Sequence, residues 1–350
     1  MKNPKNKNVP VRRCLTALSF VVVALLLPVG GAWAQSQEVI WQLPSAGTAV
    51  TFSPDGQAVL AGNQLRAAAN GQLIRTLNLR HGSGSSVNAV AFSPDGQYCA
   101  IGVQASGLNL NFFRVSDGFR TVPTESHNNG TTTAQFSPDG QFVATGGRDG
   151  TVKLWHVPDF TLRNTFLGTA GYGARIFSVV FSADGQYLAV GGSGGLIILQ
   201  ISTGKVVQRL VDASETVQSL SLTADGSTLA GGFFTSQDGT IYNVKLWRFS
   251  DGALLKTIPA SDQPINSVAF QPDAQVIASG GGDDASAGVV RFFKVKDSSQ
   301  LGFFPQDPNN LSSYVKSVAY SPSGQFIAYA RADSFVVVAR NPFSSALRPR

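Results

Sequence analysis

Two short motifs in this sequence have the residue types of reactive sites. Residues 191–195 spell Gly-x-Ser-x-Gly, the letters of a nucleophile elbow, in which a strained serine attacks an ester or amide. Asp283 and Asp284 are adjacent carboxylates, which are ligands that a hard cation such as calcium prefers. These motifs would point to a hydrolase or to a calcium site.

The surroundings of these motifs do not favour that chemistry. A nucleophile elbow lies between a strand and a helix, whereas residues 191–195 are expected to close a hairpin. Strand-end carboxylates such as Asp283 and Asp284 are usually solvated. The three histidines (His81, His127 and His156) lack the spacing of a zinc site, which needs three or four converging ligands. We therefore predict no catalytic residue, no metal and no cofactor.

A six-residue phrase recurs seven times and organises the whole chain. It reads Phe-Ser-Pro-Asp-Gly-Gln at residues 52–57, and the copies follow at intervals of 40, 44, 45, 41, 48 and 50 residues. Their first residues are Phe52, Phe92, Phe136, Phe181, Leu222, Phe270 and Tyr320. A fixed period in this range indicates one supersecondary unit of four strands copied many times. The sequence therefore predicts an all-β, seven-bladed β-propeller with four antiparallel strands in each blade.

The third repeat shows the expected strands most clearly. They are residues 131–136, 141–147, 151–156 and 161–166, each rich in Val, Phe, Leu or Thr. Pro and Asp-Gly at the connections suit tight turns. The last repeat has too few strands, so residues 38–43 are expected to supply its outer strand and close the ring. Deletion of residues 36–43 should then destabilise the whole ring.

The first 34 residues have the three parts of a cleavable secretory signal. Five basic residues and no acid lie in residues 1–13, an apolar run follows from Leu15 to Val29, and Ala32-Trp33-Ala34 ends the segment. A retained membrane anchor is the rival interpretation, but it needs about 20 unbroken apolar residues. Arg12-Arg13 would also permit a twin-arginine export route. We predict cleavage after Ala34, a propeller over residues 35–342 and a tail over 343–350.

Removal of this signal changes the charge balance. The chain has 27 basic and 21 acidic residues, net +6, but without the five basic residues of the signal 22 remain against 21. A balance near zero gives no support for nucleic-acid binding. Only Cys99 remains, on an apolar stretch, so no internal disulfide is expected and the thiol should serve packing. We expect an exported monomer, periplasmic or extracellular, without a stable membrane span after cleavage.

The stretch from Gly146 to Trp155, Gly-Gly-Arg-Asp-Gly-Thr-Val-Lys-Leu-Trp, resembles the core of a WD40 repeat. Residues 243–247, Asn-Val-Lys-Leu-Trp, resemble it too. The resemblance extends over about residues 38–340. It implies a structural hydrogen-bond tetrad within a blade, which only the third repeat matches in full: His127, Thr145, Asp149 and Trp155. Elsewhere the histidine position holds Ser83, Tyr172, Ala213, Ser261 and Leu311.

Differences between the repeats point to one face of the ring. The extra residues fall between second and third strands or between blades, and both kinds of connection lie on the same face. The residues predicted to contact a partner there are Arg148, Tyr172, Phe233, Phe234, Asp283, Asp284 and Tyr314. The alternative is that these loops are tolerated insertions without a binding role.

The WD40 resemblance implies a non-enzymatic scaffold that binds an unidentified protein or peptide. The alternative is an extracytoplasmic propeller enzyme, similar to lactonases, or a glycan-binding propeller. Such proteins gather acids, histidines or metal ligands at the channel mouth. The first-strand residues expected to line the channel contain no acid: Asn88, Gln135, Ser178, Gln218, Asn266 and Lys316. The sequence therefore favours the scaffold.

Overall fold

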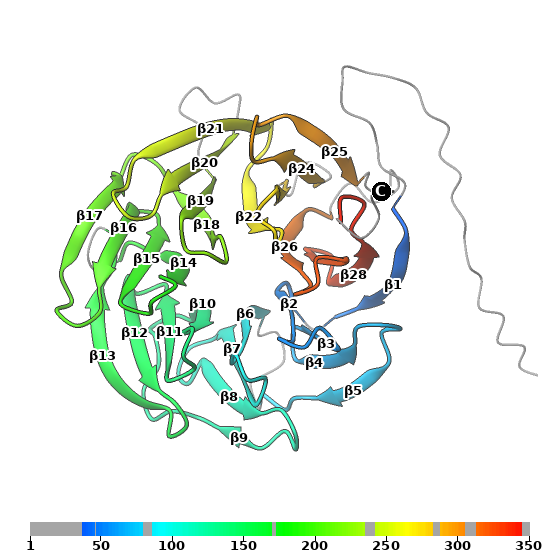
Figure 1. Ribbon diagram of the computed structural model, residues 1–350. Helices are drawn as coiled ribbons and strands as arrows, with labels where there is room; N and C mark the ends of the chain where they lie inside the picture. Colours follow the sequence, from blue (N-terminus) through cyan, green and yellow to red (C-terminus); the bar gives the residue numbers. More distant parts are fainter. Residues whose placement is uncertain are drawn as a thin grey trace, which may run out of the picture.

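The computed structural model describes residues 37–45, 47–79, 86–169, 173–234, 242–282, 288–304 and 313–344. Within these ranges the chain forms 28 strands, and they contain no helix that is long and apolar enough to cross a membrane. The strands make seven four-stranded antiparallel sheets, which stand as blades around a central axis (Figure 1). The prediction of a seven-bladed β-propeller is confirmed.

The strands of each blade are named A to D from the axis outward, and the blades are numbered along the chain. Blade 1 comprises β2 (Val50–Phe52), β3 (Ala58–Ala61), β4 (Gln64–Ala67) and β5 (Leu73–Thr76); blade 2, β6 (Ser86–Phe92), β7 (Tyr98–Gln104), β8 (Leu110–Arg114) and β9 (Arg120–Thr121); blade 3, β10 (Thr131–Phe136), β11 (Phe142–Gly147), β12 (Thr151–His156) and β13 (Thr161–Leu167). Blade 4 comprises β14 (Ile176–Phe181), β15 (Tyr187–Gly192), β16 (Gly195–Gln200) and β17 (Val206–Val211); blade 5, β18 (Val217–Leu222), β19 (Thr228–Phe233), β20 (Tyr242–Arg248) and β21 (Leu254–Ser261). Blade 6 comprises β22 (Ile265–Phe270), β23 (Val276–Gly281), β24 (Val290–Lys294) and β25 (Gln300–Phe304); blade 7, β26 (Val315–Tyr320), β27 (Phe326–Arg331), β28 (Phe335–Arg340) and β1 (Val39–Pro44).

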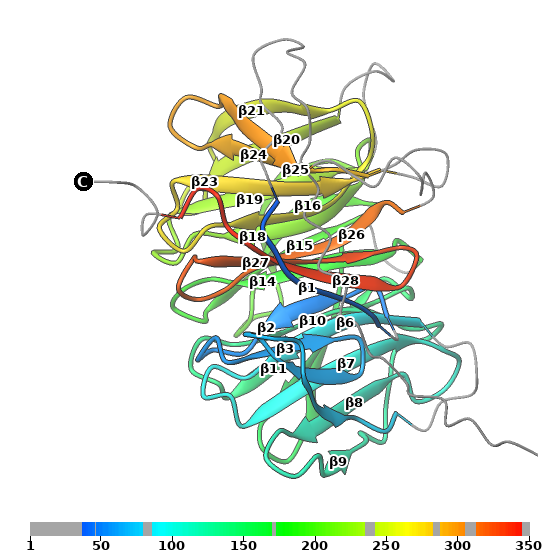
Figure 2. The same ribbon diagram turned by 90° about the vertical axis from the view of Figure 1, so that its right-hand side faces the viewer.

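Alternating strand directions give the ring two different faces. The A–B and C–D turns lie on one face, the turn face. The B–C turns and the connections between blades lie on the other, the loop-rich face. Figure 2 shows the ring from its side, with the strands crossing its thickness.

The hydrophobic core is divided among the blade interfaces. Seven clusters of buried side chains occur, and each one joins two consecutive blades, including the last to the first. A middle strand therefore has a neighbouring blade on both faces, which explains why all six residues of β23 are buried. Cys99 belongs to the cluster between blades 1 and 2, and burial raises the pKa of its thiol to about 12.

The recurrent phrase is a self-contained turn. In blade 1, Ser53 Oγ donates a hydrogen bond to Asp55 Oδ1 (2.5 Å) and accepts one from the Ala58 amide (2.9 Å). Asp55 Oδ1 also accepts the Gln57 amide (3.0 Å), and Gly56 has φ 70°, a value that glycine adopts without strain. Because all of these contacts lie within six residues, the phrase closes the same turn in every blade that keeps it.

The inner strands use side chains to join one blade to the next. Strand A has no backbone partner on the side that faces the axis, so its amides on that edge need other acceptors. Hydroxyls of the preceding blade supply them: Ser178 Oγ accepts the Leu220 amide (3.0 Å), and Ser219 Oγ accepts the Val268 amide (3.0 Å). These polar side chains therefore hold the ring together.

The N-terminal strand closes the ring, as predicted from the incomplete last repeat. β1 pairs antiparallel with β28, one residue later than expected, at Val39–Pro44. Glu38 and Arg340 form an ion pair of 2.8 Å. On the other side, the Trp41 indole donates to the Ala68 carbonyl of blade 1 (2.8 Å). β1 is thus held both by blade 7 and by blade 1, which agrees with a stabilising role for this strand.

Candidate functional site on the loop-rich face

The predicted contact residues fall on different blades of the loop-rich face. Arg148 lies in the B–C turn of blade 3, Phe233 and Phe234 lie at the end of β19 in blade 5, and Tyr314 directly precedes β26 in blade 7. The remaining predicted residues lie outside the described ranges: Tyr172, Asp283 and Asp284. The structure therefore brings the four described residues to one face without bringing them into one pocket.

The prediction that Phe233 contacts a partner is wrong. Its side chain is 1 % exposed and packs in the cluster between blades 4 and 5. The Nζ of Lys245 lies 4.5 Å from the centre of its ring, and this ammonium also forms an ion pair of 2.7 Å with Glu215. Successive side chains of a strand point to opposite faces, and the Phe233 side chain points into the interface between blades 4 and 5. It cannot contact a partner at the surface.

Phe234 is the exposed member of the pair. Its side chain is 44 % exposed, while its amide donates to the Thr216 carbonyl (3.1 Å). The backbone of this residue is therefore tied to the start of strand A of the same blade, and the ring projects from a fixed position. A large apolar side chain held in this way is a suitable contact for another protein.

Arg148 is half-buried at the junction of blades 2 and 3. Its Nη2 donates to Gln104 Oε1 of blade 2 (2.8 Å). Burial lowers the pKa of Arg148, and the nearby Arg175 lowers it further. Neither guanidinium has an ion pair with a carboxylate in the described part of the chain. The two arginines therefore place positive charge on the loop-rich face at blades 3 and 4.

Tyr314 is half-buried beside the second-to-third strand connection of blade 6. Its carbonyl accepts the Ala332 amide (2.9 Å), and the Nζ of Lys316 lies 4.4 Å from the centre of its ring. A cation above an aromatic face is stabilised by the ring's quadrupole. Tyr314 thus has a defined position at the inner edge of this face.

The four residues of the WD40-like tetrad form a continuous chain of hydrogen bonds. The Trp155 indole N–H donates to Thr145 Oγ1 (2.9 Å), and His127 Nε2 lies 2.8 Å from the same oxygen. His127 Nδ1 lies 3.1 Å from Asp149 Oδ1. A consistent assignment has the Thr145 hydroxyl donating to Nε2 and the Nδ1–H donating to Asp149. These bonds join the connection that precedes blade 3 to three parts of that blade.

The tetrad has a structural role, because three of its four side chains are buried and out of reach of a ligand. His127 is 1 % exposed, and Thr145 and Trp155 are fully buried. Burial alone would raise the pKa of Asp149, but the hydrogen bond from His127 and those from Thr151 outweigh it and hold the pKa well below its usual range. Asp149 Oδ2 also accepts the Asn128 amide (2.8 Å). The carboxylate thus stays ionised, and both of its oxygens accept hydrogen bonds within the blade.

The sequence did not point to the ion pair of Lys245 and Glu215. Lys245 occupies the same place in strand C as Lys153 in blade 3, and this match was visible in the two Val-Lys-Leu-Trp motifs. No sequence pattern identified Glu215 as the partner, because it lies in a connection whose length differs between repeats. Blade 6 has a related contact, in which Arg291 lies 3.0 Å from Ser261 Oγ and 3.4 Å from Asp262.

Three of the six polar residues predicted to line the axis make contacts between blades. Gln135 Oε1 accepts the Phe181 amide (2.6 Å), and Asn266 Nδ2 donates to the carbonyls of Gly282 (3.0 Å) and Val315 (3.1 Å). Ser178 makes the contact described above. Among the described residues, no group of three or more His, Cys, Asp or Glu side chains could hold a metal ion.

Comparison with protein families gives a match to the WD domain, G-beta repeat. The matched stretches are residues 71–107, 120–156, 161–199 and 252–287. Each begins at the outer strand of one blade and continues into the inner strands of the next, so a sequence repeat straddles two blades. A comparison with curated proteins gives no match. Four stretches of this chain are therefore similar to the WD40 repeat, and the ring that contains them is a seven-bladed propeller.

Proposed function

We propose that this protein is an exported, non-enzymatic scaffold that binds a protein or peptide through its loop-rich face. The WD40 repeats support this proposal, because the β-propeller that they build is a typical protein-interaction scaffold. The observation that carries the proposal is Phe234, a large apolar side chain that is 44 % exposed and fixed by its backbone. Arg148 and Tyr314 add residue types that are enriched in binding hot spots.

Affinity capture with the mature protein as bait tests the proposal. Envelope extract and culture fluid are applied to three baits: the unchanged protein, Phe234→Ser with Arg148→Gln, and Phe119→Ser. Phe119 is the matched control, because it is 62 % exposed but follows the C–D turn of blade 2 on the turn face. Loss of a hot-spot side chain weakens binding by about tenfold or more.

A protein retained by the unchanged bait and by Phe119→Ser, but lost from the loop-face variant, supports the proposal. Retention of the same proteins by all three baits contradicts it. Phe234→Ser and Phe119→Ser change exposed side chains, which usually alters stability by less than about 0.5 kcal/mol. Thermal melting of all three baits is compared, because Arg148→Gln also removes the hydrogen bond to Gln104.

Export has a separate test. The basic start, the apolar run and the Ala32-Trp33-Ala34 ending support cleavage after Ala34. N-terminal sequencing of protein recovered from outside the cytoplasm should begin at Gln35. Recovery of the intact N-terminus, or of the protein in the cytoplasm alone, contradicts this part of the proposal.

A further inference from the structure

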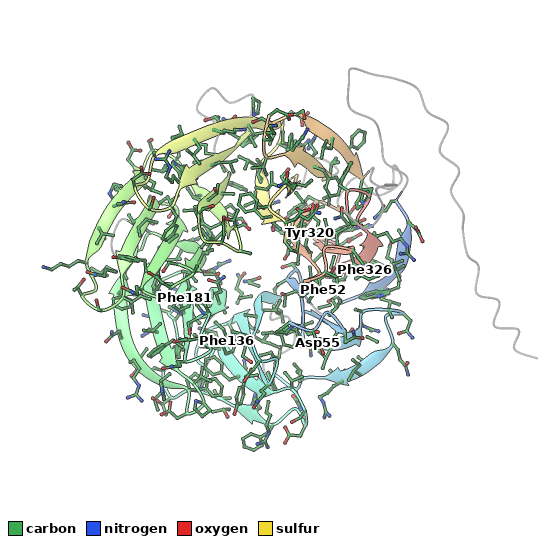
Figure 3. All side chains as sticks on the ribbon, in the orientation of Figure 1. Phe52, Asp55, Phe136, Phe181, Tyr320 and Phe326 are labelled. Carbon is green, nitrogen blue, oxygen red and sulfur yellow. The ribbon has the colours of Figure 1, made fainter. Side chains whose placement is uncertain are left out.

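The turn face is hollowed beside the central axis. Two adjoining cavities of about 460 and 350 Å³ lie there and share Gln135, Pro138 and Phe181 as lining residues. Their walls come from the last residues of the A strands and from the A–B turns of blades 1 to 5. Figure 3 shows Phe136 and Phe181 beside the central opening. Volumes of this size hold a few side chains rather than a folded domain.

The lining of the hollow is uncharged and of mixed polarity, with somewhat more polar than apolar surface exposed. Pro94 and Pro138 contribute exposed apolar surface, whereas Phe181 is only 4 % exposed and lies beneath it. No residue that lines either cavity carries a charge. The walls can therefore cover the aliphatic stem of a long side chain, as apolar surfaces do for lysine and arginine.

The rim of the same hollow is strongly acidic. Four lining residues of the A–B turns are each followed directly by an exposed aspartate. These four aspartates are Asp95, Asp139, Asp184 and Asp225. In Asp139, Oδ1 accepts the Ser137 hydroxyl (2.6 Å) and the Gln141 amide (3.0 Å), while Oδ2 has no hydrogen-bond partner among the described residues. One oxygen of this carboxylate thus faces outward.

The rim carboxylates are not neutralised by neighbouring basic groups. The hydrogen bond from Ser182 lowers the pKa of Asp184, and that from Thr223 lowers the pKa of Asp225. None of the four rim aspartates has an ion pair in the described ranges. The seven A–B turn phrases also contain no lysine or arginine. Their charges therefore add to a negative potential over the hollow.

The outer part of the turn face differs, because its aspartates are paired. In the C–D turns, Asp117 pairs with Arg114 (2.5 Å), Asp251 with Arg248 (2.6 Å) and Asp297 with Lys294 (3.4 Å). In blade 3, Asp159 faces His156 (3.0 Å) and Arg163 (3.5 Å). The carboxylates of these outer turns are thus compensated, whereas those beside the hollow are not.

We propose that the hollow on the turn face binds an extended, basic segment of a partner protein. The stems of lysine or arginine side chains lie on the exposed rings of Pro94 and Pro138, and their charged ends pair with the rim carboxylates. The size of the cavities fits a segment of chain, and the charge of the rim selects a cationic one. This surface lies on the face opposite to the proposed scaffold face, so the inference does not rest on that proposal.

Fluorescence anisotropy with a labelled peptide of alternating arginine and glycine tests the inference. A peptide of about eight residues spans roughly 26–29 Å when extended. Saturable binding to the unchanged protein is expected, with an affinity that falls as salt is raised, because exposed charge pairs are screened. A variant with all four rim aspartates changed to asparagine should bind about tenfold more weakly. Asparagine keeps the Oδ1 acceptor of the turn, so the blades should remain folded.

The matched control removes the same number of charges from the outer turns. It carries Asp117→Asn, Asp159→Asn, Asp251→Asn and Asp297→Asn, and it should lose less than about twofold in affinity, because these carboxylates are already paired. Equal losses in the two variants would show that net charge alone attracts the peptide and would overturn the inference. Absence of saturable or salt-dependent binding to the unchanged protein would overturn it even if the rim variant failed to fold. Phe234→Ser should bind the peptide normally, which separates this surface from the proposed scaffold face.

Discussion

Blades 3 and 5 share a strand C motif but secure it in different ways. Both contain Val-Lys-Leu-Trp, at residues 152–155 and 244–247. In blade 3 the indole of Trp155 donates to Thr145, which is joined to His127. In blade 5 the place of Thr145 is taken by Gly231, which lies opposite Lys245 as Thr145 lies opposite Lys153.

The missing side chain at Gly231 leaves room for a different packing. A Cβ on Gly231 would lie 2.9 Å from Cζ3 of Trp247, so the Trp247 ring occupies the space of the absent threonine. The connection that leads into blade 5 is held instead by Glu215 and Lys245 (2.7 Å). One strand motif is therefore compatible with a hydrogen-bond chain that ends on the Asp149 carboxylate and with a buried ion pair of lysine and glutamate.

The largest expected effect comes from Lys245→Met, since it leaves Glu215 buried without its partner. Removal of one member of a buried ion pair costs about 3–5 kcal/mol of unfolding free energy. Lys153→Met is the matched change in blade 3, where Glu125 lies 3.7 Å away and its side chain is 58 % exposed. That change should cost less than about 1 kcal/mol. Urea unfolding of both variants measures the difference, and equal losses would contradict the proposed contrast.

His127→Ala should have the next largest effect. It removes the acceptor of the buried Thr145 hydroxyl, which still accepts the Trp155 indole N–H, and it opens a cavity; together these cost about 3 kcal/mol. The corresponding position of blade 5 is Ala213, which is exposed. Ala213→Ser should therefore change the unfolding free energy by less than about 0.5 kcal/mol. If His127→Ala unfolds at the same urea concentration as the unchanged protein, the tetrad does not stabilise blade 3.

Gly231→Thr tests whether blade 5 can accept the threonine of blade 3. The added atoms would overlap the Trp247 ring, so we expect a loss of about 2 kcal/mol from overpacking. Thr145→Ser in blade 3 keeps the hydroxyl and should cost less than about 1.5 kcal/mol. Thermal unfolding measures both variants. A gain in stability from Gly231→Thr would mean that the ring of Trp247 is free to move into a tetrad-like position.

The smallest expected effect is the part of the pH dependence of stability that Asp149 of blade 3 contributes. The folded pKa of Asp149 lies below its unfolded value of about 3.9. Its stabilising contribution is therefore complete above that value and is lost as the pH falls through it toward the folded pKa. Asp149→Asn should lower the unfolding free energy by about 1 kcal/mol at neutral pH, and the difference should shrink below about pH 4. A constant difference from pH 7 to pH 3 would contradict this account.

Features that depend on residues close together in the chain could be predicted from the sequence. The strands of the third repeat were predicted to within one residue, because their turns are set by local contacts such as those of Ser137 and Asp139. The number of blades and closure by β1 were predicted from the period and from the incomplete last repeat. The tetrad was predicted through the WD40 resemblance, and its four residues do form one hydrogen-bond chain.

Features that depend on side-chain direction or on distant partners could not be predicted in the same way. Phe233 and Phe234 are adjacent and chemically identical, yet one is 1 % and the other 44 % exposed. Only the pairing of β19 with β18, in which Phe233 lies opposite Val217, decides which ring points inward. An aspartate is present in six of the seven phrases, but the position of four of them around a hollow depends on the closed ring.

By itself, the sequence determined the repeat, its turns and the number of blades, because each turn is formed by hydrogen bonds within six residues. Tertiary structure alone decided which polar groups meet between elements, as Glu215 meets Lys245 and Ser178 meets the Leu220 amide. The physical reason is the separation along the chain between the residues that form each feature. A turn is specified by its own residues, whereas a buried ion pair or a surface hollow requires the blades to be placed side by side first.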